Sequence, residues 1–357
     1  MSQSGSYLMN AWYVAALSQE LSADTLFDRT LLDIPVVLYR RADGTPIAML
    51  DRCPHRFAPL SMGRLEQDSV ICPYHGLRFD CTGTCNHNPH GPGTISPRAK
   101  VPTYPVIERF GFIWIWLGDA DADESLLPHH PTLGSGHEHA VAYTYMPRDC
   151  HYELIIDNVM DLSHVDHLHG EMITTRGQLS PQIPDVIEAD GTVSVRWLWQ
   201  QTPPILILND FLPQPGEPAR HFVEVTWSAP SHIQLTIGAT QNGAVETLNF
   251  DTTVAQYDFH TCTPESATST HYFFASRRNH HEEDAEFNQL KIQGMHNAFV
   301  DEDGPLLDRL QQRMGSADFF SLNPVLISSD AGPVRVRRIL AERIAEEQAQ
   351  DGKPAGS

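Results

Sequence analysis

The chain has 357 residues, of which 41% are hydrophobic and 19% charged, so its composition is typical of a globular protein and excludes a disordered chain. Its formal net charge of −21 argues against a nucleic-acid partner, because phosphate repels an acidic surface. Six cysteines in a chain of this length do not form a disulfide scaffold, and the length suffices for two domains with their own cores.

The beginning of the chain, MSQSGSYLMNAWYVAA, has neither a basic start nor a long apolar core, so we predict no signal peptide. The longest apolar run, FGFIWIWLG at residues 110–118, is much too short to cross a bilayer. We therefore expect a cytoplasmic protein without a membrane segment.

Residues 30–120 consist of short runs that are typical of strands and turns, such as IPVVLYR followed by RADG. A stretch rich in proline and histidine at 126–139 is typical of a connection between domains. We predict a first, all-β domain at residues 1–122 and a second domain at 123–350. Residues 351–357 are expected to form a disordered tail.

The second domain begins with HYELIIDNVMDLSHVDHLH, whose apolar spacing favours a helix. In TVSVRWLW (192–199) and SHIQLTIG (231–238) apolar residues alternate with polar ones, which predicts antiparallel strands with one covered face. Two more helical patterns follow, at 287–299 and 334–347. The sequence contains no GxGxxG motif and no P-loop, so any nicotinamide or flavin chemistry belongs to another protein.

Two short loops in the first domain each offer one cysteine and one histidine, as Cys53-x-His55 and Cys72-x-x-His75. A zinc finger usually places cysteine with cysteine and histidine with histidine. A mixed pair in each loop favours a two-metal site instead, in which the cysteines hold one metal and the histidines the other. A Rieske [2Fe–2S] cluster has this division. A further C-x3-C pair, Cys81 and Cys85, is interpreted as passive because four ligands complete the cluster.

This spacing and the surrounding segments NAWYVAAL, DRCPHRFAPLSMG and CPYHGLRFD resemble the Rieske non-heme iron oxygenases, in the branch of vanillate O-demethylase and dicamba monooxygenase. The resemblance covers nearly the whole chain, as far as SSDAGPVRVRRI near its end. The cluster motif is highly specific, whereas the match at the substrate level is weaker. The resemblance implies an α+β protein: an N-terminal all-β Rieske domain, then a catalytic domain with a curved antiparallel sheet and covering helices of the helix-grip type.

A second group of candidate ligands lies in Asp161-x-x-His164-x4-His169. Two imidazoles and one carboxylate with open positions form the ligand set of oxygen-activating mononuclear iron(II). On an ideal helix, residues five apart differ by about 140°, so His164 would share a face more easily with His167 than with His169. The family motif resembles D-x-x-H-x4-H and implies His164 and His169, with a helix distortion or end near Gly170. The alternative is a helix that carries surface histidines.

By resemblance, the third iron ligand is an aspartate of a late helix, and Asp303 in the segment VDED matches best, with Asp301 as its rival. Gly304 and Pro305 follow directly, and proline disfavours a helix interior. Asp303 could therefore be the N-cap of the helix PLLDRLQQRM instead. His296 is a weaker alternative ligand.

The resemblance also implies roles for Asp161 and Asn158. The carboxylate of Asp161 is expected to accept hydrogen bonds from the iron-ligating His164 and from the cluster ligand His75 of the next subunit, which orients both rings. This link requires a head-to-tail ring, most simply a homotrimer. Asn158 is expected to lie beside the iron without ligating it.

The activity implied by the resemblance is that of a terminal oxygenase, which uses O2 and electrons from NADH to hydroxylate and so demethylate a small aromatic compound. The electrons would arrive through a ferredoxin, an NADH-dependent flavin reductase, or both. His260 lines up with a histidine that reaches the polar group of the substrate, although a core histidine is equally compatible with its strand. By resemblance, Gly294 stands at a position where the dicamba enzyme has a tryptophan. The smaller residue would leave one wall of the pocket open.

Other functions fit the same sequence. Within the family, an N-dealkylase or a methyl or ring hydroxylase competes with an O-demethylase. A Rieske electron carrier without oxygenase activity would contain two irons per chain rather than three. A zinc-stabilised binding protein would be colourless.

Overall fold

The computed structural model describes residues 7–169, 173, 175–315 and 318–351, so most of the predicted tail lies outside the described residues. The chain divides into two compact units. The first contains residues 1–127 together with 263–266, and the second contains 128–262 and 267–357. The sequence placed this boundary five residues earlier, at 122/123. Among the described residues, no helix combines the length and the apolarity that a membrane span requires.

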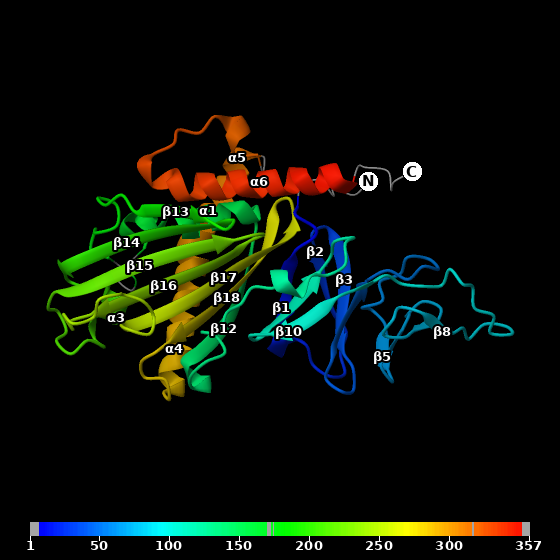
Figure 1. Cartoon of the computed structure of the whole chain (residues 1–357). Helices are drawn as coiled ribbons and strands as arrows, with labels where there is room; N and C mark the ends of the chain where they lie inside the picture. The colour runs from blue at the N-terminus through cyan, green and yellow to red at the C-terminus, as the bar shows by residue number, and fades with distance from the viewer. Residues whose placement is uncertain (1–6, 170–172, 174, 316–317, 352–357) are drawn as a thin grey trace. The chain divides into compact units, whose positions relative to one another are not determined.

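The described part of the first unit is built from antiparallel strands in three sheets, with one 3-10 turn, Ser18–Glu20, after its first strand and another, Glu124–Leu126, near its end (Figure 1). The apolar run near residue 114 is the central strand β11 of the first sheet, and all its residues are buried. The strands, in sheet order, are β1 (Trp12–Leu17), β11 (Phe112–Trp116) and β10 (Val106–Arg109); β2 (Phe27–Leu31), β3 (Ile34–Arg40), β4 (Pro46–Leu50) and β9 (Thr103–Tyr104); and β5 (Arg64–Glu66), β6 (Ser69–Ile71), β7 (Arg78–Phe79) and β8 (Cys85–His87).

The second unit is organised around a seven-stranded antiparallel sheet (Figure 1). The predicted alternation is confirmed in β14, where Val193, Val195 and Trp197 are buried and the residues between them are not. The strands, in sheet order, are β12 (Val141–Arg148), β18 (Ser269–Arg278), β17 (Val254–Ser266), β16 (His232–Thr240), β15 (Ala219–Ser228), β14 (Thr192–Thr202) and β13 (Asp185–Ala189).

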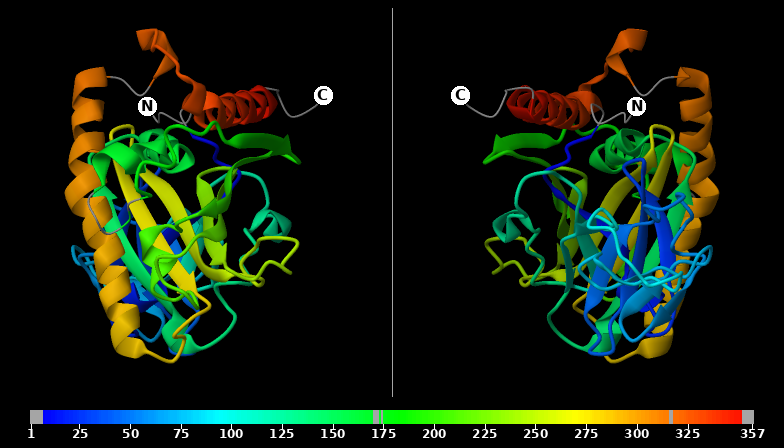
Figure 2. Two further views of the ribbon diagram at one scale, coloured as in Figure 1. Left: turned by 90° about the vertical axis from the view of Figure 1, so that its left-hand side faces the viewer. Right: turned by 90° about the vertical axis from the view of Figure 1, so that its right-hand side faces the viewer.

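Helical segments pack with this sheet, and three of them follow one another without a break. Figure 2 shows α4 (Ala285–Asn297), the π-helical turn η5 (Ala298–Asp303) and α5 (Gly304–Met314) as one continuous rod. The remaining helical segments are η3 (Glu138–Ala140), α1 (Tyr152–Met160), η4 (Leu162–His164), α2 (Val165–Leu168), α3 (Leu206–Asn209), η6 (Phe320–Leu322), η7 (Ser328–Asp330) and α6 (Ala331–Asp351). The predicted α+β fold class, a β domain followed by an antiparallel sheet with helices, is confirmed.

Residues 263–266 lie where β17 turns into β18, yet they are part of the first unit. Leu32 donates its backbone N–H to the carbonyl of Pro264 at 2.7 Å, and Asp33 donates to Glu265 at 3.0 Å. The hydroxyl of Thr263 donates to the carbonyl of Val14 at 2.7 Å. Three of these four residues therefore form hydrogen bonds with the rest of the first unit.

Candidate functional site

The two loops with Cys53 and Cys72 have the same backbone geometry. Each cysteine N–H donates to the carbonyl five residues later, at 2.9 Å in both loops. Each cysteine carbonyl in turn accepts from the residue four positions later, Phe57 at 2.9 Å and Gly76 at 3.1 Å. Phe57 and Gly76 both adopt a positive φ, 59° and 69°, which only the glycine does without steric cost. The turns thus place the two cysteines equivalently, while the histidines follow two residues after Cys53 and three residues after Cys72.

The four predicted cluster ligands divide by burial as well as by chemistry. The Cys53 and Cys72 side chains are buried, whereas His55 is exposed and His75 half-exposed, with their ring centroids 4.5 Å apart. Burial raises the pKa of the Cys53 thiol to about 11, so its thiolate needs a positive partner such as iron. Two buried sulfurs and two neighbouring imidazoles near the surface fit a Rieske cluster. Cys81 and Cys85 belong to neither loop.

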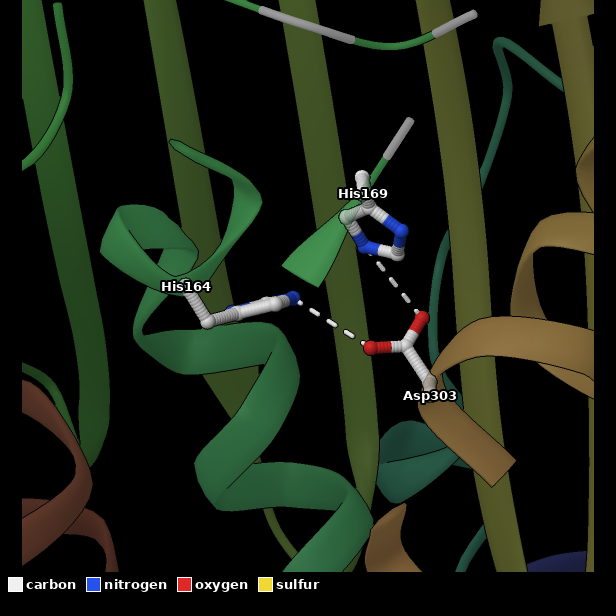
Figure 3. Close-up of side chains that lie close together, drawn as sticks. All are labelled: His164, His169 and Asp303. Carbon is white, nitrogen blue, oxygen red and sulfur yellow. Dashed lines mark ion pairs between the residues drawn. The ribbon is translucent and has the colours of Figure 1, made fainter. Parts of the chain in front are cut away.

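The second candidate centre brings together His164, His169 and Asp303 (Figure 3). His164 Nε2 lies 3.4 Å from Asp303 Oδ1, and His169 Nε2 lies 3.4 Å from Asp303 Oδ2. One candidate ligand atom from each residue lies within 4.8 Å of the other two. Asp303 is 1% exposed, and its Oδ2 accepts no hydrogen bond from the described residues. A buried carboxylate oxygen of this kind, faced by two imidazole nitrogens, fits a metal ion.

A break in the predicted helix explains how His164 and His169, five residues apart, can face the same point. The single helix expected over 151–169 is wrong in its continuity: α1 ends at Met160, Asp161 leaves the helical conformation, and η4 and the short α2 follow. His169 comes after the end of α2 in an extended conformation, with φ −84° and ψ 145°, so its ring can turn to the side of His164. His167 points instead to the Ser180 hydroxyl at 2.8 Å. Gly170 lies outside the described residues.

Asp303 is not a helix cap. It has helical dihedrals at the end of η5, its side chain makes no capping hydrogen bond, and Pro305 occupies the first turn of α5. In a π-helical turn the hydrogen-bond ladder is interrupted, so the missing N–H of a proline just beyond it costs little. The rival Asp301 is exposed, and His296 Nδ1 lies 2.7 Å from the hydroxyl of Thr144.

Three contacts orient the candidate ligands. His164 Nδ1 donates to the Asp161 carbonyl at 2.5 Å, and His169 Nδ1 donates to Glu302 Oε2 at 2.6 Å. Asn158 donates its amide to Asp303 Oδ1 at 3.0 Å. Burial acts to lower the pKa of His164, but Asp303 and Asp161 outweigh it and raise that pKa. Such outer contacts fix the tautomer and the direction of each metal-binding ring.

Two of these contacts depart from the sequence prediction. For Asp161, the backbone carbonyl rather than the carboxylate contacts His164, because the carboxylate accepts from the N–H of Ser163 at 3.0 Å at the start of η4. Glu302 was missed, since only the fold brings it to His169. Its one signal in the sequence is its place in the acidic segment beside Asp303.

A pocket that His164 and His169 help to line extends along the sheet. Its described lining is mainly apolar and includes Val159, Ile205, Val223, Ile237, Met295 and Phe299. Polar side chains of β17 join the lining, and among them His260 is fully buried, with its Nδ1 2.6 Å from the Tyr272 hydroxyl. Gly294 precedes Met295 on α4 but is absent from the described lining, so its role at the substrate stays a prediction.

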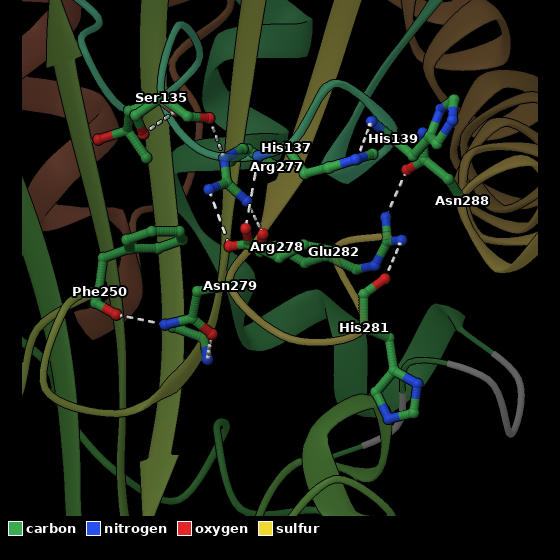
Figure 4. Close-up of polar contacts among 12 residues, drawn as sticks. Ser135, His137, His139, Phe250, Arg277, Arg278, Asn279, His281, Glu282 and Asn288 are labelled. Atoms are coloured by element: carbon green, nitrogen blue, oxygen red, sulfur yellow. Dashed lines mark hydrogen bonds and ion pairs between the residues drawn. The ribbon is translucent and has the colours of Figure 1, made fainter. Parts of the chain in front are cut away.

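The start of α4, the helix that carries Met295, is fixed by the end of β18 (Figure 4). The Arg278 guanidinium donates to the side chain of Asn288 in the first turns of α4, at 2.5 Å, and to the carbonyl of His281 at 2.7 Å. Arg277 donates to the carbonyl of Ser135 at 2.9 Å. The rod that leads to Asp303 is therefore tied to the sheet at its beginning.

Comparison with known proteins assigns both units. Residues 11–105 match the Rieske [2Fe-2S] domain, and residues 148–346 match the vanillate O-demethylase oxygenase C-terminal domain. The oxygenase component of dicamba O-demethylase from Stenotrophomonas maltophilia is 36% identical over 341 residues, which cover 93% of this chain and 96% of that protein. The oxygenase component of chloroacetanilide N-alkylformylase from Rhizorhabdus wittichii is 34% identical, over 96% of this chain and 97% of that protein.

Among solved structures, the crystal structure of dicamba monooxygenase bound to dicamba matches with a TM-score of 0.87 at 34% identity. The match covers 96% of this chain and 99% of that chain, so it includes both units.

Proposed function

Because this chain belongs to the vanillate O-demethylase oxygenase family of Rieske non-heme iron proteins, we propose that it demethylates a small aromatic compound as the terminal component of a multicomponent system. It is a monooxygenase with a Rieske [2Fe–2S] cluster and a mononuclear iron. The observation that carries the proposal is the buried Asp303 carboxylate facing His164 and His169 at one end of an apolar pocket.

In this proposal Cys53, His55, Cys72 and His75 hold the cluster. His164, His169 and Asp303 hold the mononuclear iron. When bound, this iron supplies the activation of O2 for insertion of one oxygen atom into a substrate C–H bond, with electrons that arrive through the cluster.

The chain's own side chains prepare that step in two ways. Asn158 and Glu302 hold Asp303 and His169 in fixed directions, which keeps the ligand atoms together. The apolar lining excludes water and lets the methyl-bearing end of a substrate lie beside the ligands. A hydroxylated O-methyl or N-methyl group then collapses to a phenol or an amine and formaldehyde without further help from the protein.

O-demethylation is the first candidate, and N-dealkylation is the second. The first is supported by the similarity to the dicamba enzyme, the second by a similarity of nearly equal extent to the N-alkylformylase. Both insert oxygen at a carbon attached to a heteroatom, so the same iron site can serve either.

Electron delivery requires partners. We propose a ferredoxin, an NADH-dependent flavin reductase, or both, in the cytoplasm where NADH is available. We also propose a head-to-tail homotrimer in which Asp161 accepts from His75 of the partner subunit. Asp161 is only half-buried and its carboxylate accepts from Ser163 alone among the described residues, which leaves an oxygen for this contact.

The test is a substrate screen with the purified protein, a reductase and NADH, in which oxygen uptake and formaldehyde release are followed together. The two should appear in equal amounts with an accepted methoxyarene or N-methylarene. Asp303→Asn should abolish both while the visible spectrum of the cluster persists, and Asp301→Asn is the matched control. A protein that accepts electrons but holds only two irons per chain would be a carrier, and the proposal would then be wrong.

A further inference from the structure

One strand brings three polar side chains to the pocket at the same face. Gln256, Asp258 and His260 alternate along β17, and residues two apart on a strand point to the same side. All three are at most 1% exposed. In a lining that is otherwise mainly apolar, they form one polar edge, called here the β17 edge.

The β17 edge carries two oxygen acceptors without a donor among the described residues, and His260 Nε2 also has no hydrogen-bond partner there. The Gln256 amide nitrogen donates to Asp258 Oδ2 at 2.6 Å, and this bond orients the amide so that its oxygen points elsewhere. Gln256 Oε1 and Asp258 Oδ1 accept no hydrogen bond from the described residues. Leaving a buried acceptor unpaired is costly, so two adjacent ones at a pocket wall indicate a ligand that donates to them.

The β17 edge presents a carboxylate to the pocket without a neighbouring cation in the described lining. Asp258 forms no ion pair among the described residues, and no described lysine or arginine lines the pocket. Lys291 is half-buried on α4 with a buried ammonium nitrogen, and it attracts the Asp258 carboxylate without lining the pocket. Burial lowers the pKa of His260 to about 3, so this ring is neutral and gives no cation to the edge.

We propose that the substrate presents an N–H donor, as in an aromatic amide or amine, to Gln256 Oε1 and Asp258 Oδ1, and that Asp258 excludes substrates with a carboxylate at this position. The inference rests on the proposed function, and it adds the chemical class of the substrate. An NH2 group has two hydrogens and can donate one to each unpaired acceptor. A carboxylate would instead meet the Asp258 charge with no basic partner in the described lining, and specificity of this kind comes largely from the repulsion.

The experiment compares two compounds that differ only in the head group, 4-methoxybenzamide and 4-methoxybenzoate. Calorimetric binding to the holoenzyme and turnover with reductase and NADH are measured for both. The benzamide should bind at least about tenfold more tightly than the benzoate. Asp258→Asn should reduce this preference by about tenfold, and Gln256→Leu should weaken the benzamide alone. Asp185→Asn, at an exposed position of β13, is the matched control and should preserve the preference.

The two readouts separate the inference from the function. Preferred binding of the benzamide without formaldehyde release would contradict the proposed demethylation but support the recognition. Tighter binding of the benzoate, binding of neither compound, or a preference that Asp258→Asn leaves unchanged would each overturn the inference. The iron content of each variant shows that its metal centres are intact.

Discussion

At the scale of single residues, the candidate iron ligands are oriented by side chains outside the proposed ligand set. Glu302 accepts a hydrogen bond from His169 Nδ1, and Asn158 donates one to Asp303. Both residues contact a candidate ligand in the fold. In the sequence, only Glu302 is adjacent to a candidate ligand, Asp303. The family motif suggested the candidate ligands, since helix spacing alone favoured His167 over His169. The supporting contacts could not be predicted, because they join segments more than a hundred residues apart.

Glu302→Gln should weaken iron binding at the mononuclear site. The amide accepts a hydrogen bond from His169 but lacks the negative charge that makes the ring a stronger ligand, and loss of such a contact typically reduces metal affinity 10–100-fold. Iron titration of the metal-free site measures the change, and Asp301→Asn, at the exposed neighbour in η5, should leave the affinity unaltered. Equal affinities for the wild type and Glu302→Gln would contradict the role of Glu302.

Asp258→Asn should stabilise the protein more at neutral than at acid pH. Burial raises the pKa of Asp258 from its ordinary value of 3.8 to about 6. Between these values the folded chain holds a proton that the unfolded chain has lost, so the stability of the wild type falls as the pH rises through this window. The gain from Asp258→Asn should therefore grow by roughly 2.4 kcal/mol between pH 4 and pH 7.

Denaturant unfolding at several pH values measures this gain. Asp185→Asn, whose carboxylate is exposed, should show no comparable trend. A stability difference for Asp258→Asn that is the same at every pH would show that Asp258 is not held near neutrality by burial.

At the scale of elements, the sequence was informative where a pattern is local. Alternation along β14 and the repeated Cys–His loops were predicted and found, because strand periodicity and turn chemistry depend on neighbouring residues. The π-helical turn η5 was not predicted, since Gly304 and Pro305 look like the start of a new helix. The break at Asp161 was also missed, because α1 and α2 share one apolar periodicity.

The contact between α1 and α6 gives a prediction at this scale. Arg337 of α6 is 6% exposed and donates to the carboxylates of Asp157 and Glu153 on α1. Arg337→Met would leave two half-buried carboxylates without their cation, at a cost of about 3 kcal/mol in the free energy of unfolding. Arg338→Met is the matched control, since Arg338 pairs with Glu188 in solvent and should cost less than about 1 kcal/mol. Equal losses in urea unfolding would contradict the prediction.

At the scale of the whole molecule, the two candidate centres use ligands from separate units. The wild type should contain about three iron atoms per chain. Cys53→Ser should remove the cluster and leave about one, whereas Asp303→Ala should leave about two with the cluster spectrum intact. Iron analysis together with visible spectroscopy measures both. Loss of all iron in either variant would show that the centres do not assemble independently.

The four residues 263–266 have a consequence for any attempt to divide this protein. A gene truncated after codon 127 would encode every strand of the Rieske half and still omit the partners of Val14, Leu32 and Asp33. Recombination after residue 127 would exchange an incomplete unit, because residues 263–266 of the same unit follow more than a hundred residues later. A functional transplant of this half therefore has to carry the Thr263–Ser266 tetrapeptide as a graft.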